Sequence, residues 1–233
     1  MWIKQFPKLK IIIIFIVIFF SSWLYLLFRL SQQPQKYAQY WSRPIGQSGQ
    51  LVYVAMGDSA AQGIGASSPQ KSYVSLLAQS IKKKTGKEVQ IINISQSGAT
   101  IDDVIKNQLP VLDKLNPDVI TLDIGGNDLR EYDKKEFTIS ITKLTSQLPK
   151  QTIIADTPYF MHGIWERQAV EASRVLIQQA KFNGLTIAPL HMSMKNKGWP
   201  SMFYLYAPDW FHPNDKGYEV WHDAFWKVIE PEL

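Results

Sequence analysis

Short apolar runs that alternate with amphipathic segments determine the fold class of this chain. The apolar runs are the candidate strands, and they cover residues 51–56, 88–94, 118–124, 152–155 and 185–188. The segments with helical spacing follow them, at residues 72–84, 101–115, 135–147, 164–182 and 215–229. Pro110 should interrupt the second of these helices because proline lacks the N–H group that a helix interior needs. Alternating strands and helices form a parallel sheet covered on both faces, so we predict a three-layer α/β/α fold with five parallel strands.

The N-terminus has a different composition from the rest of the chain. Residues 11–28 contain no charged side chain, and Arg29 ends this run. About twenty helical residues are needed to cross the hydrocarbon layer of a bilayer. We therefore expect residues 11–30 to form a transmembrane helix that precedes the α/β domain.

The basic residues around this run suggest its orientation. Lys4, Lys8 and Lys10 precede it, which favours a cytoplasmic segment 1–10 and an extracytoplasmic domain. Arg29 and Lys36 follow it and weaken this preference.

An uncleaved signal anchor and a cleaved signal peptide are the two alternatives for the apolar run. A signal peptide has an apolar core of about 7–15 residues and a small-x-small cleavage site. The run here is longer and no such site follows, which favours the anchor over a secreted product. Residues 31–50 contain six glutamines, two prolines and two glycines without periodicity, so we expect a linker there and a domain over residues 51–233.

Charge and cysteine content exclude several classes of function. The formal net charge is +5, but residues 1–43 hold six basic and no acidic side chains. The remaining 19 basic and 20 acidic residues nearly cancel, so the domain lacks the basic surface of a nucleic-acid-binding protein. The absence of cysteine excludes disulfides, cysteine-ligated zinc and a cysteine nucleophile.

Residues with nucleophilic and basic side chains follow the predicted strands. Ser59 comes directly after the first strand, and a serine becomes a nucleophile when a histidine removes its proton. His212 lies three residues after Asp209, just before the last helix, so the aspartate can orient the imidazole. Asp58 adjoins Ser59 and should point away from it, because neighbours on an extended chain diverge; we expect it to support the turn instead. The carboxyl ends of parallel strands meet at one edge of a sheet, where these groups would converge.

Two further positions suit the stabilisation of an oxyanion. Gly98 can present its backbone N–H without a Cβ in the way, and Asn127 can present its side-chain amide. The less favoured alternatives are that Gly98 is a simple turn glycine and that Asn127 caps the next segment. Asp128 is expected to accept a hydrogen bond from loop backbone.

Four short blocks in this order resemble the SGNH hydrolase superfamily, also called GDSL esterases/lipases. They are Gly57-Asp58-Ser59, with alanine in place of the leucine of the family name, then Ser97-Gly98-Ala99, Gly125-Gly126-Asn127-Asp128 and Asp209-Trp210-Phe211-His212. The resemblance covers about residues 50–230 and implies a flavodoxin-like fold. It implies that Ser59 is the nucleophile, His212 the base and Asp209 its partner. It also implies an oxyanion hole made by Ser59, Gly98 and Asn127, with no metal and no cofactor.

The sequence thus predicts a membrane-anchored serine esterase, and lipid or lysophospholipid-like acyl esters are the favoured substrates. Removal or transfer of acyl groups on cell-envelope polysaccharide, by the same residues, is the alternative. A non-catalytic scaffold is a third interpretation, and the intact Ser59, Asp209 and His212 argue against it. Aromatic residues crowd residues 199–211, and two of them, Trp210 and Phe211, are candidate substrate-binding residues that could instead lean on the membrane or pack within the loop.

Overall fold

A five-stranded parallel sheet forms the centre of the molecule. The computed structural model describes residues 7–233 except 48–49, 161–162, 199 and 201. The strands lie in the order β2-β1-β3-β4-β5, and every neighbouring pair is parallel. They are β1 (Leu51–Gly57), β2 (Val89–Asn93), β3 (Val119–Asp123), β4 (Thr152–Ala155) and β5 (Thr186–Ala188). This is the flavodoxin-like strand order, so the predicted fold class is confirmed.

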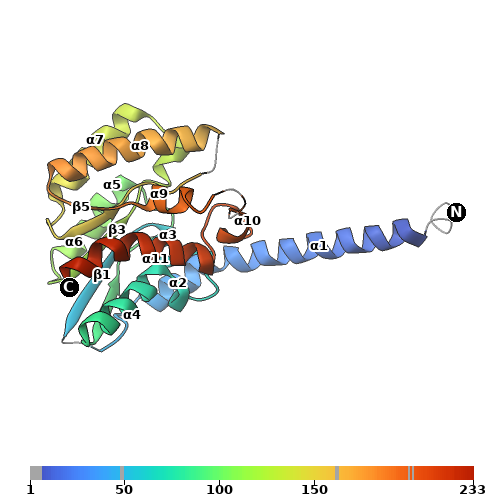
Figure 1. The fold of residues 1–233 in the computed structure, drawn as a ribbon, viewed down its shortest axis with the longest axis horizontal. Helices are drawn as coiled ribbons and strands as arrows, with labels where there is room; N and C mark the ends of the chain where they lie inside the picture. The colour runs from blue at the N-terminus through green and yellow to red at the C-terminus, as the bar shows by residue number, and fades with distance from the viewer. Residues whose placement is uncertain (1–6, 48–49, 161–162, 199, 201) are drawn as a thin grey trace.

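Helices cover both faces of the sheet (Figure 1). One face packs against α4 (Tyr73–Thr85) and α11 (Asp215–Ile229), and the other against α7 (Lys134–Gln147) and α8 (Gly163–Phe182). Side chains alternate between the two faces of a strand, and β1 shows this directly. Tyr53 and Ala55 join the first core, whereas Val54 and Met56 join the second.

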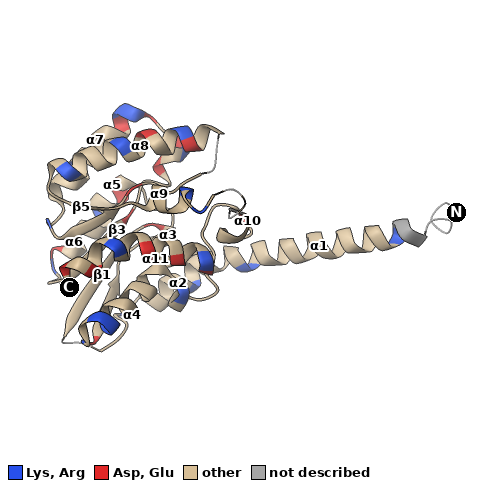
Figure 2. Ribbon diagram, viewed as in Figure 1, with Lys and Arg blue, Asp and Glu red and all other residues tan. Residues whose placement is uncertain are grey.

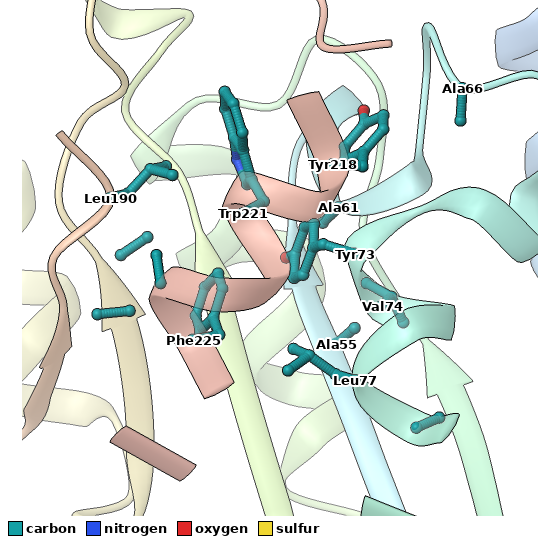
Figure 3. Packing of buried hydrophobic residues seen from close by; sticks show 14 of the residues in the cluster. Ala55, Ala61, Ala66, Tyr73, Val74, Leu77, Leu190, Tyr218, Trp221 and Phe225 are labelled. Carbon is teal, nitrogen blue, oxygen red and sulfur yellow. The ribbon is translucent and has the colours of Figure 1, made fainter. Parts of the chain in front are cut away.

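The last helix is fixed to the middle of the sheet by aromatic packing and one polar contact. The rings of Tyr73 in α4 and Phe225 in α11 stack with centroids 5.0 Å apart (Figure 3). The Trp221 indole N–H donates to Asp123 Oδ2 at the end of β3, at 2.9 Å. Because α11 begins three residues after His212, these contacts also help to fix the position of that histidine.

Short elements fill the connections at the two ends of the strands. The helix expected over residues 101–115, with an interruption at Pro110, is present over residues 101–112. It continues without a break through α5 (Ile101–Asp103), a wide π-helical turn (Val104–Gln108) and α6 (Leu109–Leu112). The π-helical turn comes just before Pro110, which cannot donate a hydrogen bond to the preceding turn. Other short helices of the domain are α3 (Ser59–Gln62), α9 (Leu190–Lys195) and α10 (Met202–Leu205), with single 3₁₀ turns at Pro69–Lys71, Asp128–Glu131 and Glu230–Glu232.

A long apolar helix, α1 (Pro7–Ser31), projects from the domain (Figure 1). Figure 2 shows a basic residue near each end of α1 and no charged residue between them. Within the described part of the chain, it supplies the single stretch that is long and apolar enough to cross a membrane.

The expected linker over residues 31–50 is wrong for its first half. Residues Gln33–Trp41 form a helix, α2, whose Tyr37 and Trp41 are buried against the domain. The Tyr37 hydroxyl donates to Ala66 O at 2.7 Å, and the Trp41 indole N–H donates to Gln62 O at 3.0 Å. Two aromatics four residues apart lie on one helix face, a signal that the surrounding glutamines obscure. The folded unit therefore begins at Gln33 or earlier.

Candidate active site

Ser59 stands at the sharp turn between β1 and α3. Gly57 ends the strand with φ +133°, and a Cβ at this position would collide with the carbonyl oxygen of Asp123. Only glycine fits this combination of backbone angle and close approach. Asp58 caps α3, because its Oδ1 accepts from the Ala60 N–H at 2.9 Å. Ser59 is thereby fixed as the first residue of α3, and it is almost buried.

The structure brings His212 and Asp209 to Ser59. His212 Nε2 lies 2.9 Å from Ser59 Oγ, and His212 Nδ1 lies 2.6 Å from Asp209 Oδ2. The other carboxylate oxygen, Oδ1, accepts from the backbone N–H groups of Phe211 and His212, each at 3.1 Å. Both oxygens of Asp209 are therefore held, and the carboxylate cannot rotate away from the imidazole.

The charge of Asp209 determines which nitrogen of His212 carries the proton. Burial raises the pKa of Asp209, but hydrogen bonding and charge from His212, helped by the two backbone donors, bring that pKa below its ordinary value of 3.8. An ionised carboxylate only accepts hydrogen bonds, so Nδ1 must be the protonated nitrogen. Nε2 then presents its lone pair to the Ser59 hydroxyl, which is the arrangement of a general base.

Gly98 and Asn127 lie beside the Ser59 turn, in the loops that follow β2 and β3. The Gln96 N–H donates to Gly57 O at 3.1 Å, which ties the Gly98 loop to the end of β1. Gly98 is exposed, with φ +82°. Neither the Ser59 N–H nor the Gly98 N–H donates to any atom of the described residues, so both are free for a ligand.

The Asn127 amide is already engaged. Its Nδ2 donates to Asp58 Oδ2 at 3.2 Å and to Ala99 O at 3.0 Å. Both amide hydrogens thus have acceptors within the protein, and an oxyanion would have to compete for one of them. As expected, Asp128 accepts from backbone: the Ile101 N–H lies 3.2 Å from its Oδ1.

Two glutamines that the sequence analysis missed hold this turn in place. Gln108, in the wide turn after α5, bonds both backbone groups of Gly57: its Oε1 accepts from the N–H and its Nε2 donates to the C=O, each at 2.8 Å. Gln62 accepts from the Ser97 hydroxyl and donates to Ser95 O at 3.1 Å. Gln62 lies one helical turn after Ser59, which is a usable sequence signal; Gln108 has none.

Buried carboxyl groups lie behind the serine. Burial, followed by the nearby Asp123, raises the pKa of Asp58 well above its ordinary value. Burial also raises the pKa of Asp123 to about 6, against the opposing hydrogen bond from Trp221. The oxygens of Asp58 are used by Ala60 and Asn127, so its expected role as support for the turn is confirmed.

Two hollows of very different size lie at the candidate site, one beside Ser59 and the other beside Gly98 and Asn127. A small cavity of about 30 Å³ lies beside Ser59 and His212, with Phe160, Phe211 and Trp221 among its walls. Phe211 thus lies in the wall of the cavity next to Ser59. Trp210 is absent from the described walls of this cavity; its indole lies against Phe203 instead, with ring centroids 5.6 Å apart.

The second hollow is a polar groove on the side of Gly98 and Asn127. Its volume is about 440 Å³. Among its described lining residues, carboxylates outnumber the one cation, Arg130; the acidic residues are Asp102, Asp128, Glu131, Asp133 and Glu136. Arg130 also lies over the Phe211 ring, 5.8 Å from its centroid, so the groove reaches the edge of the serine site.

A second Ser–His–Asp contact occurs elsewhere in the fold. His222 Nε2 lies 2.8 Å from Ser80 Oγ, and His222 Nδ1 lies 3.0 Å from Asp223 Oδ1. Ser80 lies inside α4, where the backbone N–H groups are committed to the helix and do not serve a substrate. His191 lies beside Glu166, and His162 lies outside the described residues. Among the residues that the structure describes, no cluster of side chains is suited to a metal ion.

The four sequence blocks fall within a known family. Residues 55–220 match the model of the GDSL-like lipase/acylhydrolase family. The chain belongs to this family. The resemblance seen in the sequence is confirmed, and with it the assignment of the chain as a carboxylic ester hydrolase.

Solved structures with the same fold agree with this membership. A lipase/acylhydrolase from Enterococcus faecalis is 21% identical, with a TM-score of 0.65 over 78% of this chain and 97% of its own. An acetylxylan esterase from Geobacillus stearothermophilus is 19% identical, with a TM-score of 0.62 over 77% and 94%. TesA is 20% identical, with a TM-score of 0.65 over 78% and 99%. No curated protein sequence gives a significant match.

Proposed function

We propose that this family member hydrolyses esters through Ser59, His212 and Asp209. The supporting observation is the unbroken line of contacts from Asp209 through His212 to Ser59 Oγ, at 2.6 and 2.9 Å. Ser59 Oγ attacks the ester carbonyl while His212 Nε2 takes its proton. The proton then passes to the leaving alkoxide, and the acyl group stays on Ser59. His212 next removes a proton from water, which attacks the acyl-enzyme, and returns that proton to Ser59 as the acid leaves.

The negative charge that develops on the carbonyl oxygen needs donors. We assign this role to the free N–H groups of Ser59 and Gly98. Asn127 would join them by weakening its bond to Asp58, which at 3.2 Å is the longer of its two.

The two hollows favour a short acyl group on a polar alcohol. A cavity of about 30 Å³ beside Ser59 offers the space of an acetyl group and not of a long chain. The acidic groove repels a phosphate, which disfavours the phosphate-bearing head of a lysophospholipid. A neutral, polyhydroxylated alcohol suits its carboxylates, which accept hydrogen bonds. Of the substrate classes that the sequence leaves open, O-acetyl groups on carbohydrate are therefore preferred here.

We also propose that α1 anchors the enzyme in a membrane with the domain on the extracytoplasmic side. Support comes from the uncharged length of the helix and from the three lysines that precede it.

The test is turnover of p-nitrophenyl acetate and p-nitrophenyl octanoate by the full chain in detergent. Ser59→Ala should lower kcat by about 10⁴-fold or more, the scale for loss of a serine nucleophile. Ser80→Ala is the matched control, since Ser80 also contacts a histidine, and it should keep full activity. Equal rates in the native chain and Ser59→Ala would contradict the mechanism. Preference for octanoate would restore the lipid-ester interpretation.

A further inference from the structure

The projecting helix α1 packs on the domain along one face. Trp23, Leu27 and Leu30 are spaced four and three residues apart and are half-buried or buried. The residues between them, such as Leu24 and Phe28, are exposed. The Trp23 indole N–H donates to Pro208 O at 3.1 Å. The last two turns of the apolar helix are therefore covered on one face by the domain, at the loop that carries Asp209.

This contact fixes how deep the loop lies in the membrane. At 1.5 Å per residue, the uncharged residues 11–28 extend about 27 Å, which barely fills a hydrocarbon layer of about 30 Å. Trp23 precedes the end of this run by five residues, or about 7.5 Å along the helix. If the membrane surface were moved back to Trp23, residues 11–23 would extend only about 20 Å and would not cross. With the helix across the bilayer, Pro208 therefore lies at the membrane boundary.

The side chains that the loop exposes are those expected at a membrane surface. Tyr204 is 52% exposed and Trp210 is 50% exposed. Trp210 has φ +57°, a conformation that bulky residues rarely adopt, and it is not among the described residues that line the cavity beside Phe211. Backbone strain is retained mainly where a residue has a function, which supports a functional role for the exposed indole of Trp210.

Cations accompany these aromatics. The Lys216 ammonium lies over the Tyr204 ring, 5.6 Å from its centroid. Both residues, together with Arg29, line a hollow between α1 and the domain. Aromatic rings with lysine and arginine are typical of the headgroup level of a bilayer. The one carboxylate among the described residues of this hollow, Asp215, is used by Ser67, which donates to it from its N–H and hydroxyl.

We propose that Tyr204 and Trp210 insert into the membrane leaflet next to the domain, so that the entrance to the serine site lies at the headgroup level. This inference rests on the anchor proposed above. Its functional consequence is that the esters hydrolysed are those carried by membrane-bound molecules, whose polar parts reach the acidic groove from the same surface.

The chain contains no cysteine, so single labelling sites can be introduced. Tyr204→Cys, Trp210→Cys and Phe182→Cys would each carry an environment-sensitive fluorophore in the full chain. The chain is placed in phosphatidylcholine vesicles doped with a lipid that bears a quencher near the acyl carbonyl. Phe182 is the matched control, because it is 86% exposed and lies at the far end of α8 from α1.

We expect emission from positions 204 and 210 to shift to the blue and to be quenched, and emission from position 182 to be unaffected. If positions 204 and 210 behave like 182 while alkaline carbonate leaves the chain in the vesicles, the inference is overturned and the anchor stands. If carbonate releases the chain, the anchor and this inference both fail. Hydrolysis of p-nitrophenyl acetate in detergent is measured independently, so the proposed esterase chemistry is judged separately.

Discussion

Replacing Asp209 by asparagine should move the ring proton of neutral His212 from Nδ1 to Nε2. The backbone donors of Phe211 and His212 both point at Oδ1, so the amide oxygen of the new side chain must occupy that position. Its NH₂ group then takes the place of Oδ2 and donates to His212 Nδ1 across the former 2.6 Å contact. Nδ1 loses its hydrogen, Nε2 gains one, and the nitrogen facing Ser59 becomes a donor instead of a base.

The expected loss follows from this inverted tautomer. The same inversion in a serine protease lowers kcat about 10⁴-fold, equivalent to about 5.4 kcal/mol of activation free energy. The volume of the side chain is unchanged, so the KM for p-nitrophenyl acetate should remain close to that of the native chain. Steady-state kinetics near neutral pH measure both constants.

The matched control is Asp223→Asn. Asp223 also contacts a histidine, His222, at 3.0 Å, yet its side chain is exposed and it lies away from Ser59. Its loss should leave kcat unchanged. A kcat for Asp209→Asn within tenfold of the native value, in a chain with native circular dichroism, would refute the assignment of Asp209 as the residue that sets the tautomer of His212.

Three further substitutions test the support of the site. Gln108→Met removes both buried hydrogen bonds to Gly57 and should lower the free energy of unfolding, measured by urea denaturation, by about 2–4 kcal/mol. The control Gln147→Met changes an exposed amide and should alter this free energy little. Gly57→Ala should prevent stable folding because its Cβ meets Asp123 O, whereas Gly86→Ala meets no atom and should cost about 1 kcal/mol for its φ of +72°. Asp123 has its pKa raised to about 6, so the folded state holds its proton more tightly and stability falls as pH rises from about 4 to 6. Asp123→Asn should remove about 3 kcal/mol of that fall, and identical pH profiles for native and variant chains would contradict the argument.

The parallel sheet was predictable because its strands are short apolar runs, of which β1, β3 and β4 are almost fully buried. The position of Ser59 was predictable for the same reason, since strand ends converge at one edge. The wide turn at Val104–Gln108 was only partly predictable. Pro110 indicates that the helix is perturbed, but it does not indicate which preceding residues form the wide turn. Helix α2 was missed because its two buried aromatics are spread among glutamines, and burial depends on contacts with Gln62 and Ala66 that are distant in the chain.

Candidate site residues with nucleophilic, basic or acidic side chains were easier to predict than residues whose side chains hydrogen-bond to the backbone of the site. Ser59, Asp209 and His212 stand out by type and spacing. Gln108 acts only through its bonds to Gly57, 51 positions away, and no local pattern marks it. The engagement of Asn127 with Asp58 likewise depends on a contact across 69 positions.

The distance in sequence between Ser59 and His212 determines when, during synthesis of the chain, these two residues can first come together. They are 153 positions apart, and α11 must dock by Trp221 before His212 is held. At about 5–20 residues per second, the ribosome makes Ser59 roughly 8–30 s before it makes His212. Throughout that interval the emerging chain carries a hydroxyl with no base beside it. On the mechanism proposed above, ester hydrolysis therefore begins only after the residues of α11 have been made and have docked on the sheet.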